Sequence, residues 1–218
     1  TYGGKITASG LTITTQGSSC ASLATDRGEG TVSCTSCTLT TNGAGSPVIY
    51  STGAISITSS TGTANGAQMV VVEGKNSATV KSSTLKCTGV GNRHNVDKCG
   101  VMIYQSQSGD ADDGIGSFTA SDSTMEILST SSVYSTAPMF FVTNTEATIT
   151  LSNVTFTYGS GIFIDIEGTS EWGTSGSNGG DVTMTVTGQT IVGDIVVDDY
   201  SSLTLNLKSS SSFKGKFN

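Results

Sequence analysis

The chain has 218 residues, a formal net charge of −7 and only 10 lysines and arginines. Binding to nucleic acid depends on clustered cations, so this composition argues against a nucleic-acid partner. No long apolar run is present, and we therefore expect no membrane span. Apolar residues make up 35% of the chain, with 28 glycines and 2 prolines. Because no segment has a sustained helical period, the sequence predicts an all-β protein.

An eight-residue pattern recurs along the chain and is clearest at residues 149–156. Apolar residues occupy offsets 0, 2, 5 and 7, while a hydroxyl and a turn-prone residue occupy offsets 3 and 4. Two short strands joined by a two-residue corner explain this spacing, because alternate side chains point inward and the corner shifts the phase. The copies begin at Ile6, Val32, Ile55, Val80, Phe118, Ile149 and Met184.

The second corner position is expected to have left-handed backbone, which Gly, Asn and Asp tolerate. Gly10, Asp122 and Asn153 occupy this position in three of the copies. In the copy that begins at Val80, the corner is predicted at Ser83 and Thr84.

A second apolar strand recurs before most copies, at 48–50, 69–72, 102–104, 139–141, 162–164 and 195–197. Fixed apolar columns separated by loops of variable length are typical of a solenoid. The sequence therefore predicts a single domain over residues 1–218, a right-handed parallel β-helix of about seven to eight turns. A β-sandwich is the alternative for many short strands, but it does not require the same corner at the same offset in each unit.

The chain has five cysteines, and their positions suggest which of them form disulfides. Cys87 and Cys99 flank a polar excursion between two expected strands, and a disulfide between them is expected to close that loop. Such a bond contributes roughly 2–4 kcal/mol and fits an extracellular location. Cys34 and Cys37 form one CxxC motif, which is a weak zinc signal, and both occupy inward positions. They are interpreted as buried thiols or as part of one disulfide with Cys20.

The acidic turn at 109–115 is the candidate metal site. Asp110, Asp112 and Asp113 bring three carboxylates close together in the sequence, and Ca²⁺ takes oxygen ligands. The spacing is not that of an EF-hand, and the turn occurs only once. A calcium ion held by these three aspartates is therefore one interpretation, and a solvated acidic turn without metal is the other.

Trp172 is the only tryptophan and lies in a glycine-rich loop at 168–180. A tryptophan exposed on such a loop offers a flat apolar face that suits stacking on a sugar ring. We therefore name Trp172, Glu171 and Tyr104 as candidate ligand-binding residues. The alternative is a tryptophan folded back over the edge of the strands. His94, the only histidine, is expected in a surface loop, since no Ser or Cys partner lies near it in the sequence.

Outward threonines at offsets 6 and 8 form an array on one predicted face, at Thr12, Thr14, Thr38, Thr40, Thr61, Thr63, Thr155 and Thr157. Flat Thr-x-Thr arrays occur in ice-binding solenoids. Here Lys86, Glu126 and Val192 interrupt the array, and threonine is also a good strand residue. Ice binding is therefore an alternative function.

The apolar columns and corners resemble those of the pectin-lyase-like superfamily of right-handed β-helices over most of the chain. The Asp-Asp-Gly-Ile motif at 112–115, followed by 118–127, is similar to turns of bacterial cell-surface carbohydrate-binding β-helix proteins. This resemblance implies an extracellular, calcium-assisted role in polysaccharide binding or adhesion. We therefore expect a secreted or cell-surface, non-enzymatic protein with a structural or adhesive role that binds polysaccharide. A polysaccharide lyase is the enzymatic alternative, but it requires a base beside the acidic cluster, and Arg27 and Arg93 lie in other loops.

The two ends of a solenoid expose strand edges, which favour pairing with another chain. Residues 2–6 lead almost directly into the first predicted turn, and residues 203–207 are strand-like. Head-to-tail self-association into a filament is therefore a further alternative, unless the tail at 209–218 caps the last turn. No signal peptide is visible, which allows for one removed before Thr1.

Overall fold

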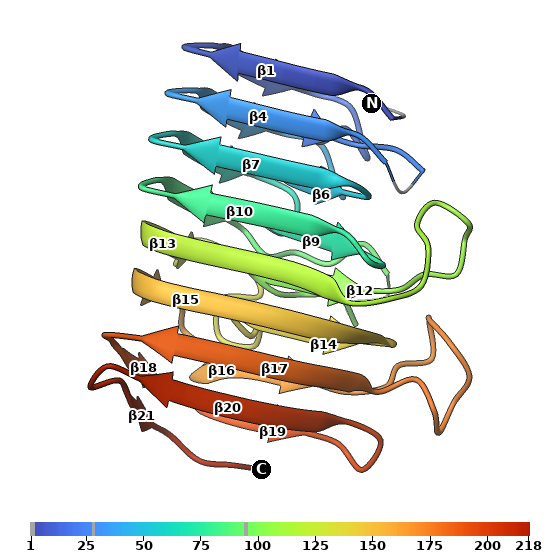
Figure 1. Ribbon diagram of the computed structural model, residues 1–218, viewed down its shortest axis with the longest axis vertical. Coiled ribbons are helices and arrows are strands. Elements are labelled where there is room, and N and C mark those ends of the chain that lie inside the picture. Colours follow the sequence, from blue (N-terminus) through green and yellow to red (C-terminus); the bar gives the residue numbers. More distant parts are fainter. Residues whose placement is uncertain (1–2, 28, 94–95) are drawn as a thin grey trace.

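The computed structural model describes residues 3–27, 29–93 and 96–218, which form strands and loops without a helix. Accordingly, these ranges contain no helix that is long and apolar enough to cross a membrane. Figure 1 shows the strands stacked in chain order, with the two chain ends at opposite ends of the stack. The prediction of an all-β, solenoid-like fold built from curled parallel sheets is confirmed. His94 lies outside the described residues.

The largest sheet has 12 strands, arranged in two rows. The first row comprises β1 (Lys5–Ser9), β4 (Thr31–Thr35), β7 (Ala54–Thr58), β10 (Ser77–Lys81), β13 (Gly116–Ile127), β15 (Thr145–Thr157), β17 (Gly180–Thr187) and β20 (Ser202–Lys208). The second row comprises β2 (Thr12–Thr15), β5 (Thr38–Thr41), β8 (Thr61–Ala64) and β11 (Thr84–Cys87). The long strands β13 and β15 continue through the corner, and the second half of β13 pairs with β11.

A second sheet of seven strands lies behind the first row in Figure 1. It comprises β3 (Leu23–Ala24), β6 (Ile49–Ser51), β9 (Val70–Glu73), β12 (Val101–Tyr104), β14 (Phe140–Thr143), β16 (Ile162–Ile166) and β19 (Asp194–Val197). The remaining pair is β18 (Thr190–Val192) with β21 (Ser212–Lys214). The apolar core contains side chains from both sheets.

Inward side chains form columns because the parallel register continues from strand to strand. One column contains Ile6, Val32, Ile55, Ala78, Phe118, Ile149, Met184 and Leu205. The column is buried from Val32 to Met184, whereas Leu205 is partly buried and Ile6 in the first strand is 48% exposed. Stacking buries each apolar side chain against the next turn, and this burial is the main stabilising contribution.

The copy of the repeat around Val80 differs from the prediction by two residues. Ala78, and not Val80, pairs with Ile55. The left-handed corner residue is Ser82, with a φ of 48°, and not Thr84. Since the side-chain period of a strand is 2, a shift of two residues keeps the same side chains inward and leaves the pattern almost unchanged.

The corners between the first and second strands of each repeat share one backbone conformation. Their positive-φ residues are Gly10, Ser36, Ser59, Ser82, Asp122, Asn153, Gly188 and Ser209. The prediction for Gly10, Asp122 and Asn153 is confirmed. Where the corner residue is serine, the left-handed conformation is held by the pairing of the strands on both sides.

Candidate functional site

The outer face of the seven-stranded sheet carries an aromatic pocket of about 340 Å³. Its floor consists of Ala24, Tyr50, Val71 and Met102, which pair in register on four successive strands. The chain neighbours of these residues point into the core, so alternation along each strand directs the floor side chains outward. The pocket is therefore a product of stacking, since each turn supplies one residue of the floor.

Trp172 and Tyr104 form the wall at one end of this floor. The Trp172 ring is only 9% exposed and meets the Tyr104 ring edge-to-face, with the ring centroids 5.0 Å apart. The side-chain amide of Asn178 donates to the carbonyls of Thr169 and Trp172, both at 2.6 Å, and holds the loop in place. Trp172 is thus folded back over the sheet, and it still lines the pocket.

The loop that precedes β12 forms the polar rim. The buried carboxylate of Asp97 accepts hydrogen bonds of 2.9 Å from the backbone N–H groups of Asn92 and Arg93. Gln68 donates its side-chain amide to the carbonyl of Asp97 at 2.5 Å. Because Asp97 and Gln68 are engaged in this way, Asn92 and Arg93 supply the side chains at the rim, together with Ser19 from an adjacent loop.

A buried carboxylate lies behind the aromatic residues. Glu73 is 1% exposed and accepts hydrogen bonds from the hydroxyls of Tyr50, Tyr104 and Ser106, the Tyr104 bond being 3.1 Å long. Burial raises the pKa of both tyrosines well above the usual value, and the nearby charge of Glu73 raises the pKa of each further. Both hydroxyls therefore remain protonated and act as donors to Glu73.

Two of the three candidate ligand-binding residues line this pocket. These two residues are Trp172 and Tyr104, and the third candidate, Glu171, does not line the pocket. The backbone N–H of Glu171 donates to the hydroxyl of Thr169 within the loop. Tyr50 and Glu73 were missed. The available signal was Glu73 itself, a carboxylate directly after the apolar run 69–72.

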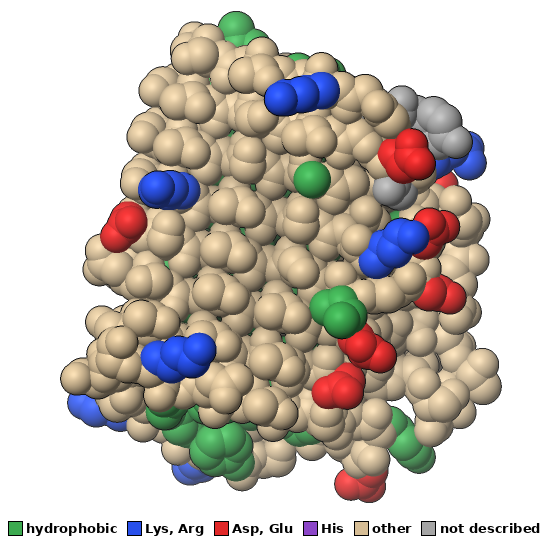
Figure 2. All heavy atoms as spheres, in the orientation of Figure 1, with side chains coloured by type: hydrophobic (Ala, Val, Ile, Leu, Met, Phe, Trp, Pro, Cys, Tyr) green, Lys and Arg blue, Asp and Glu red, His purple; other side chains and the backbone are tan. Residues whose placement is uncertain are grey.

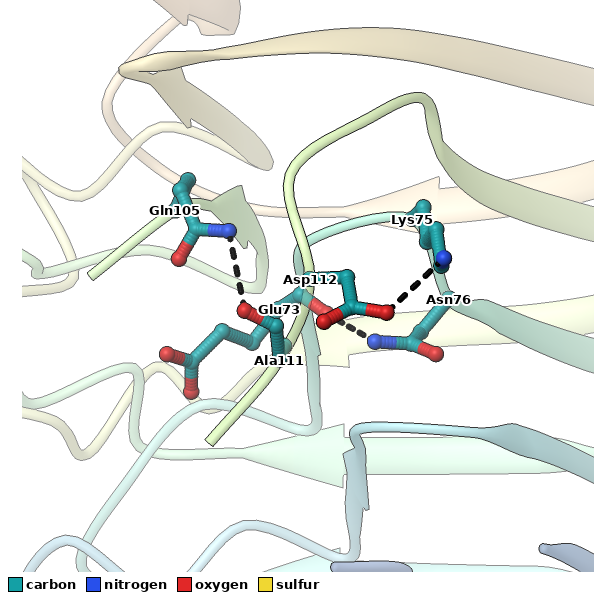
Figure 3. Close-up of polar contacts among 6 residues, drawn as sticks. All are labelled: Glu73, Lys75, Asn76, Gln105, Ala111 and Asp112. Carbon is teal, nitrogen blue, oxygen red and sulfur yellow. Dashed lines mark hydrogen bonds and ion pairs between the residues drawn. The ribbon is translucent and has the colours of Figure 1, made fainter. Parts of the chain in front are cut away.

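The acidic turn is tied to the preceding turn of the stack, as Figure 3 shows. Lys75 Nζ lies 2.8 Å from Asp112 Oδ2, and the backbone N–H of Lys75 donates to the Asp112 carbonyl. Gln105 donates its side-chain amide to the carbonyl of Ala111 at 3.3 Å. The carboxylate of Glu73 points away from the Lys75–Asp112 pair (Figure 3), and none of the residues 109–115 lines the pocket.

The structure does not gather the three aspartates of the turn into a cluster of metal ligands. Within 3–27, 29–93 and 96–218, no three side chains of His, Cys, Asp or Glu gather in a way that could hold a metal ion. Asp112 is already paired with Lys75, and a lysine at this distance opposes the binding of a cation. Asp110, Asp112 and Asp113 are therefore interpreted as a turn fixed by hydrogen bonds and one ion pair.

Comparison of the chain with protein-family models, curated proteins and solved structures found no match. The function of the chain is therefore inferred from the chemistry of its own surfaces. Besides the aromatic pocket, these include the cysteines, a buried aspartate and a hydroxyl-rich face.

The disulfide of the structure joins Cys34 and Cys37, whose Cα atoms are 6.2 Å apart. This corrects the predicted pairing of Cys87 with Cys99, since both of these are free and buried, and Cys20 is free and exposed. Cys87 belongs to the interior core and Cys99 to the apolar cluster on the outer face, so their side chains lie in different layers. Burial raises the pKa of the Cys87 thiol to about 12.

A second carboxyl lies farther along the outer face of the seven-stranded sheet. Asp165 of β16 pairs in register with Phe141, and its Oδ1 atom is buried without a hydrogen-bond partner among the described residues. Burial, followed by the charges of Glu167 and Asp198, raises the pKa of Asp165 to about 7. This aspartate therefore changes protonation near neutral pH.

The outer face of the first row is rich in serine and threonine. One column in register contains Thr7, Ser33, Ser56, Thr79 and Thr119. Figure 2 shows a broad central area without charge, framed by charged side chains. The predicted threonine array is present on the neighbouring face, where one column in register contains Thr12, Thr38, Thr61, Thr84, Thr124 and Thr155. In the adjacent column, Lys86 and Glu126 form an ion pair of 2.9 Å that interrupts the hydroxyl pattern.

Proposed function

We propose that this chain is a secreted or cell-surface, non-enzymatic β-solenoid that binds polysaccharide in the aromatic pocket. The observation that carries the proposal is the convergence of three aromatic residues, Tyr50, Tyr104 and Trp172, on one pocket. Aromatic rings offer flat apolar faces to the CH groups of a sugar ring. A volume of about 340 Å³ lies at the lower end of the range for ligand pockets, roughly 300–1,000 Å³.

The polar groups of the pocket support a hydroxyl-rich ligand. Besides the aromatic and aliphatic side chains, the pocket is lined by the polar residues Ser19, Asn92 and Arg93, and by Gln68 and Asp97, which are engaged in hydrogen bonds. A few polar groups at the edge of an apolar pocket give orientation and specificity to a ligand that has both kinds of surface. A sugar residue has this character, because its ring has apolar faces and a polar perimeter.

We also propose that the architecture is a single right-handed parallel β-helix over residues 1–218, with about seven to eight turns, similar to the pectin-lyase-like superfamily. Continuous parallel pairing along the chain supports this proposal, because parallel crossovers are almost always right-handed. The Cys34–Cys37 disulfide supports an oxidising, extracellular location.

A glycan array followed by titration tests the proposal. Because Trp172 is the only tryptophan and lines the pocket, a bound oligosaccharide is expected to change its fluorescence. Trp172→Ala and Tyr104→Ala should abolish binding to the array, whereas Tyr200→Ala removes a 60% exposed tyrosine outside this pocket and should not. Binding that survives both pocket substitutions, or no binding to any glycan, would reject the assignment.

A second candidate function is ice binding through the threonine face. The observation in its favour is the column of six threonines in continuous register. Thermal hysteresis and ice recrystallisation assays test it, with Thr61→Lys placing a charge in the column. If the unchanged protein does not retard ice growth, this candidate is rejected.

A further inference from the structure

The feature that the proposed function does not explain is Glu73. Its carboxylate is 1% exposed, and no described lysine or arginine forms an ion pair with it. A charge in such a position is unfavourable unless hydrogen bonds replace the lost water. Three hydroxyls supply these bonds, and they come from different turns of the stack: Tyr50 from β6, and Tyr104 and Ser106 from β12 and the residues after it.

The direction of these bonds decides which groups a ligand can reach. A carboxylate only accepts hydrogen bonds, so the hydroxyls of Tyr50 and Tyr104 must donate to Glu73. The two hydroxyls also lie 3.4 Å from each other, next to the same carboxylate oxygen. Both rings are therefore held at their polar ends, and they present carbon surface to the pocket.

The Tyr104 ring is held at a second point. Its edge-to-face contact with Trp172 joins the tyrosine pair to the wall of the pocket. Glu73, Tyr104 and Trp172 thus form a continuous chain of contacts from the buried carboxylate to the single tryptophan. A change at Glu73 can reach Trp172 through the orientation of the Tyr104 ring.

We infer that Glu73 is the positioning residue of the pocket: it fixes the rings of Tyr50 and Tyr104 so that a sugar residue is bound by aromatic carbon surface and by the rim, and not by tyrosine hydroxyls. This inference rests on the proposed polysaccharide function. It identifies the ligand as a pyranose residue with one apolar face against the tyrosine pair and its hydroxyl groups toward Asn92 and Arg93.

The first test is independent of any ligand. Glu73→Ala removes the acceptor, so the rings of Tyr50 and Tyr104 lose their anchor. We expect acrylamide to quench Trp172 fluorescence more strongly, and these two tyrosines to ionise at lower pH in an absorbance titration. Glu73→Gln retains a carbonyl acceptor of nearly the same shape and should restore the low quenching. Tyr158→Phe is the control, because that hydroxyl donates to the Val192 carbonyl elsewhere in the structure.

A double-mutant cycle then separates positioning from direct contact. If the Tyr104 hydroxyl acts through Glu73, Tyr104→Phe weakens binding in the unchanged protein and adds nothing in Glu73→Ala. If it contacts the sugar, it weakens binding in both backgrounds and the inference is wrong. The probes are cellopentaose, xylopentaose and mannopentaose, and we expect Glu73→Ala to lower the affinity about tenfold through lost preorganisation.

The outcomes distinguish this inference from the proposed function. Should Glu73→Ala fail to fold, the cycle is run with Glu73→Leu, which also lacks an acceptor but fills more of the buried space. Unchanged quenching and unchanged tyrosine ionisation in the variant that lacks the acceptor would overturn the positioning role, whether or not the sugars bind. Altered spectra without sugar binding by the unchanged protein would retain Glu73 as the anchor of the rings, and would reject the polysaccharide assignment and with it the inferred pyranose ligand.

Discussion

The backbone N–H of Ser60 donates a hydrogen bond of 3.0 Å to the hydroxyl of Ser83, one turn farther along the stack. The N–H of Ser83 in turn donates to the hydroxyl of Ser123 at 3.1 Å, and the N–H of Cys37 donates to that of Ser60 at 3.0 Å. These serines follow the left-handed corners, where the regular ladder is interrupted. A column of serine hydroxyls thus satisfies buried N–H groups that the strands leave unpaired.

The Ser83→Ala variant tests this column. Ser83 is buried, so its loss leaves the Ser60 N–H without an acceptor or water. A buried polar group left unpaired costs about 1–3 kcal/mol, and urea unfolding should show a loss of this size. The control is Ser33→Ala, at an outward-facing serine. Its free energy of unfolding should differ from that of the unchanged protein by less than about 0.5 kcal/mol. Equal unfolding midpoints for both variants would contradict the prediction.

The cysteine assignments predict a labelling pattern. In the native protein, iodoacetamide should modify the exposed Cys20 and spare Cys87 and Cys99, which are buried and whose thiol pKa values are raised by burial. After unfolding without a reductant, all three should react, while Cys34 and Cys37 stay joined. Peptide mass spectrometry measures this pattern. A cross-linked peptide that contains Cys87 and Cys99 would restore the original prediction from the sequence.

The raised pKa of Asp165 leads us to expect that the stability of the protein falls as the pH rises toward neutrality. Its pKa is about 7 in the folded protein, against an ordinary value of 3.8, because burial and then Glu167 and Asp198 disfavour the charge. The folded state therefore binds more protons than the unfolded state between these values, and stability falls as the pH rises through this window.

Asp165→Asn removes this titration. The variant should melt at a higher temperature than the unchanged protein above pH 7, and the difference should shrink as the pH falls toward 4. The exposed Asp113→Asn serves as the control and should show no such trend. A difference in melting temperature that stays constant with pH would show that Asp165 has an ordinary pKa.

Calcium is expected to have no effect on stability. A metal that binds the native state alone raises the melting temperature, and the described aspartates form no site for one. Melting curves in calcium and in EDTA should therefore coincide. A rise in calcium that is lost on combining Asp112→Asn with Asp113→Asn would contradict this and restore the acidic turn as a site.

The local features of the fold were readable from the sequence. Strand alternation is a property of each short segment, so the pattern at residues 149–156 predicted that Ile149 and Leu151 point inward, and both are fully buried. The left-handed corners at Gly10 and Asn153 follow from the backbone preferences of single residues. Register is less local, and the shift near Val80 was missed because a displacement of two residues preserves the alternation.

Tertiary structure alone decided the cysteine pairing and the pocket. Cys87 and Cys99 are near in sequence, yet their side chains lie in different layers, and sequence spacing does not report this. Tyr50, Glu73 and Trp172 come from separate turns and a distant loop, and only stacking brings them together. A repeat specifies which side chains face outward, but which outward side chains become neighbours depends on the register between turns and on how the loops fold over the sheet.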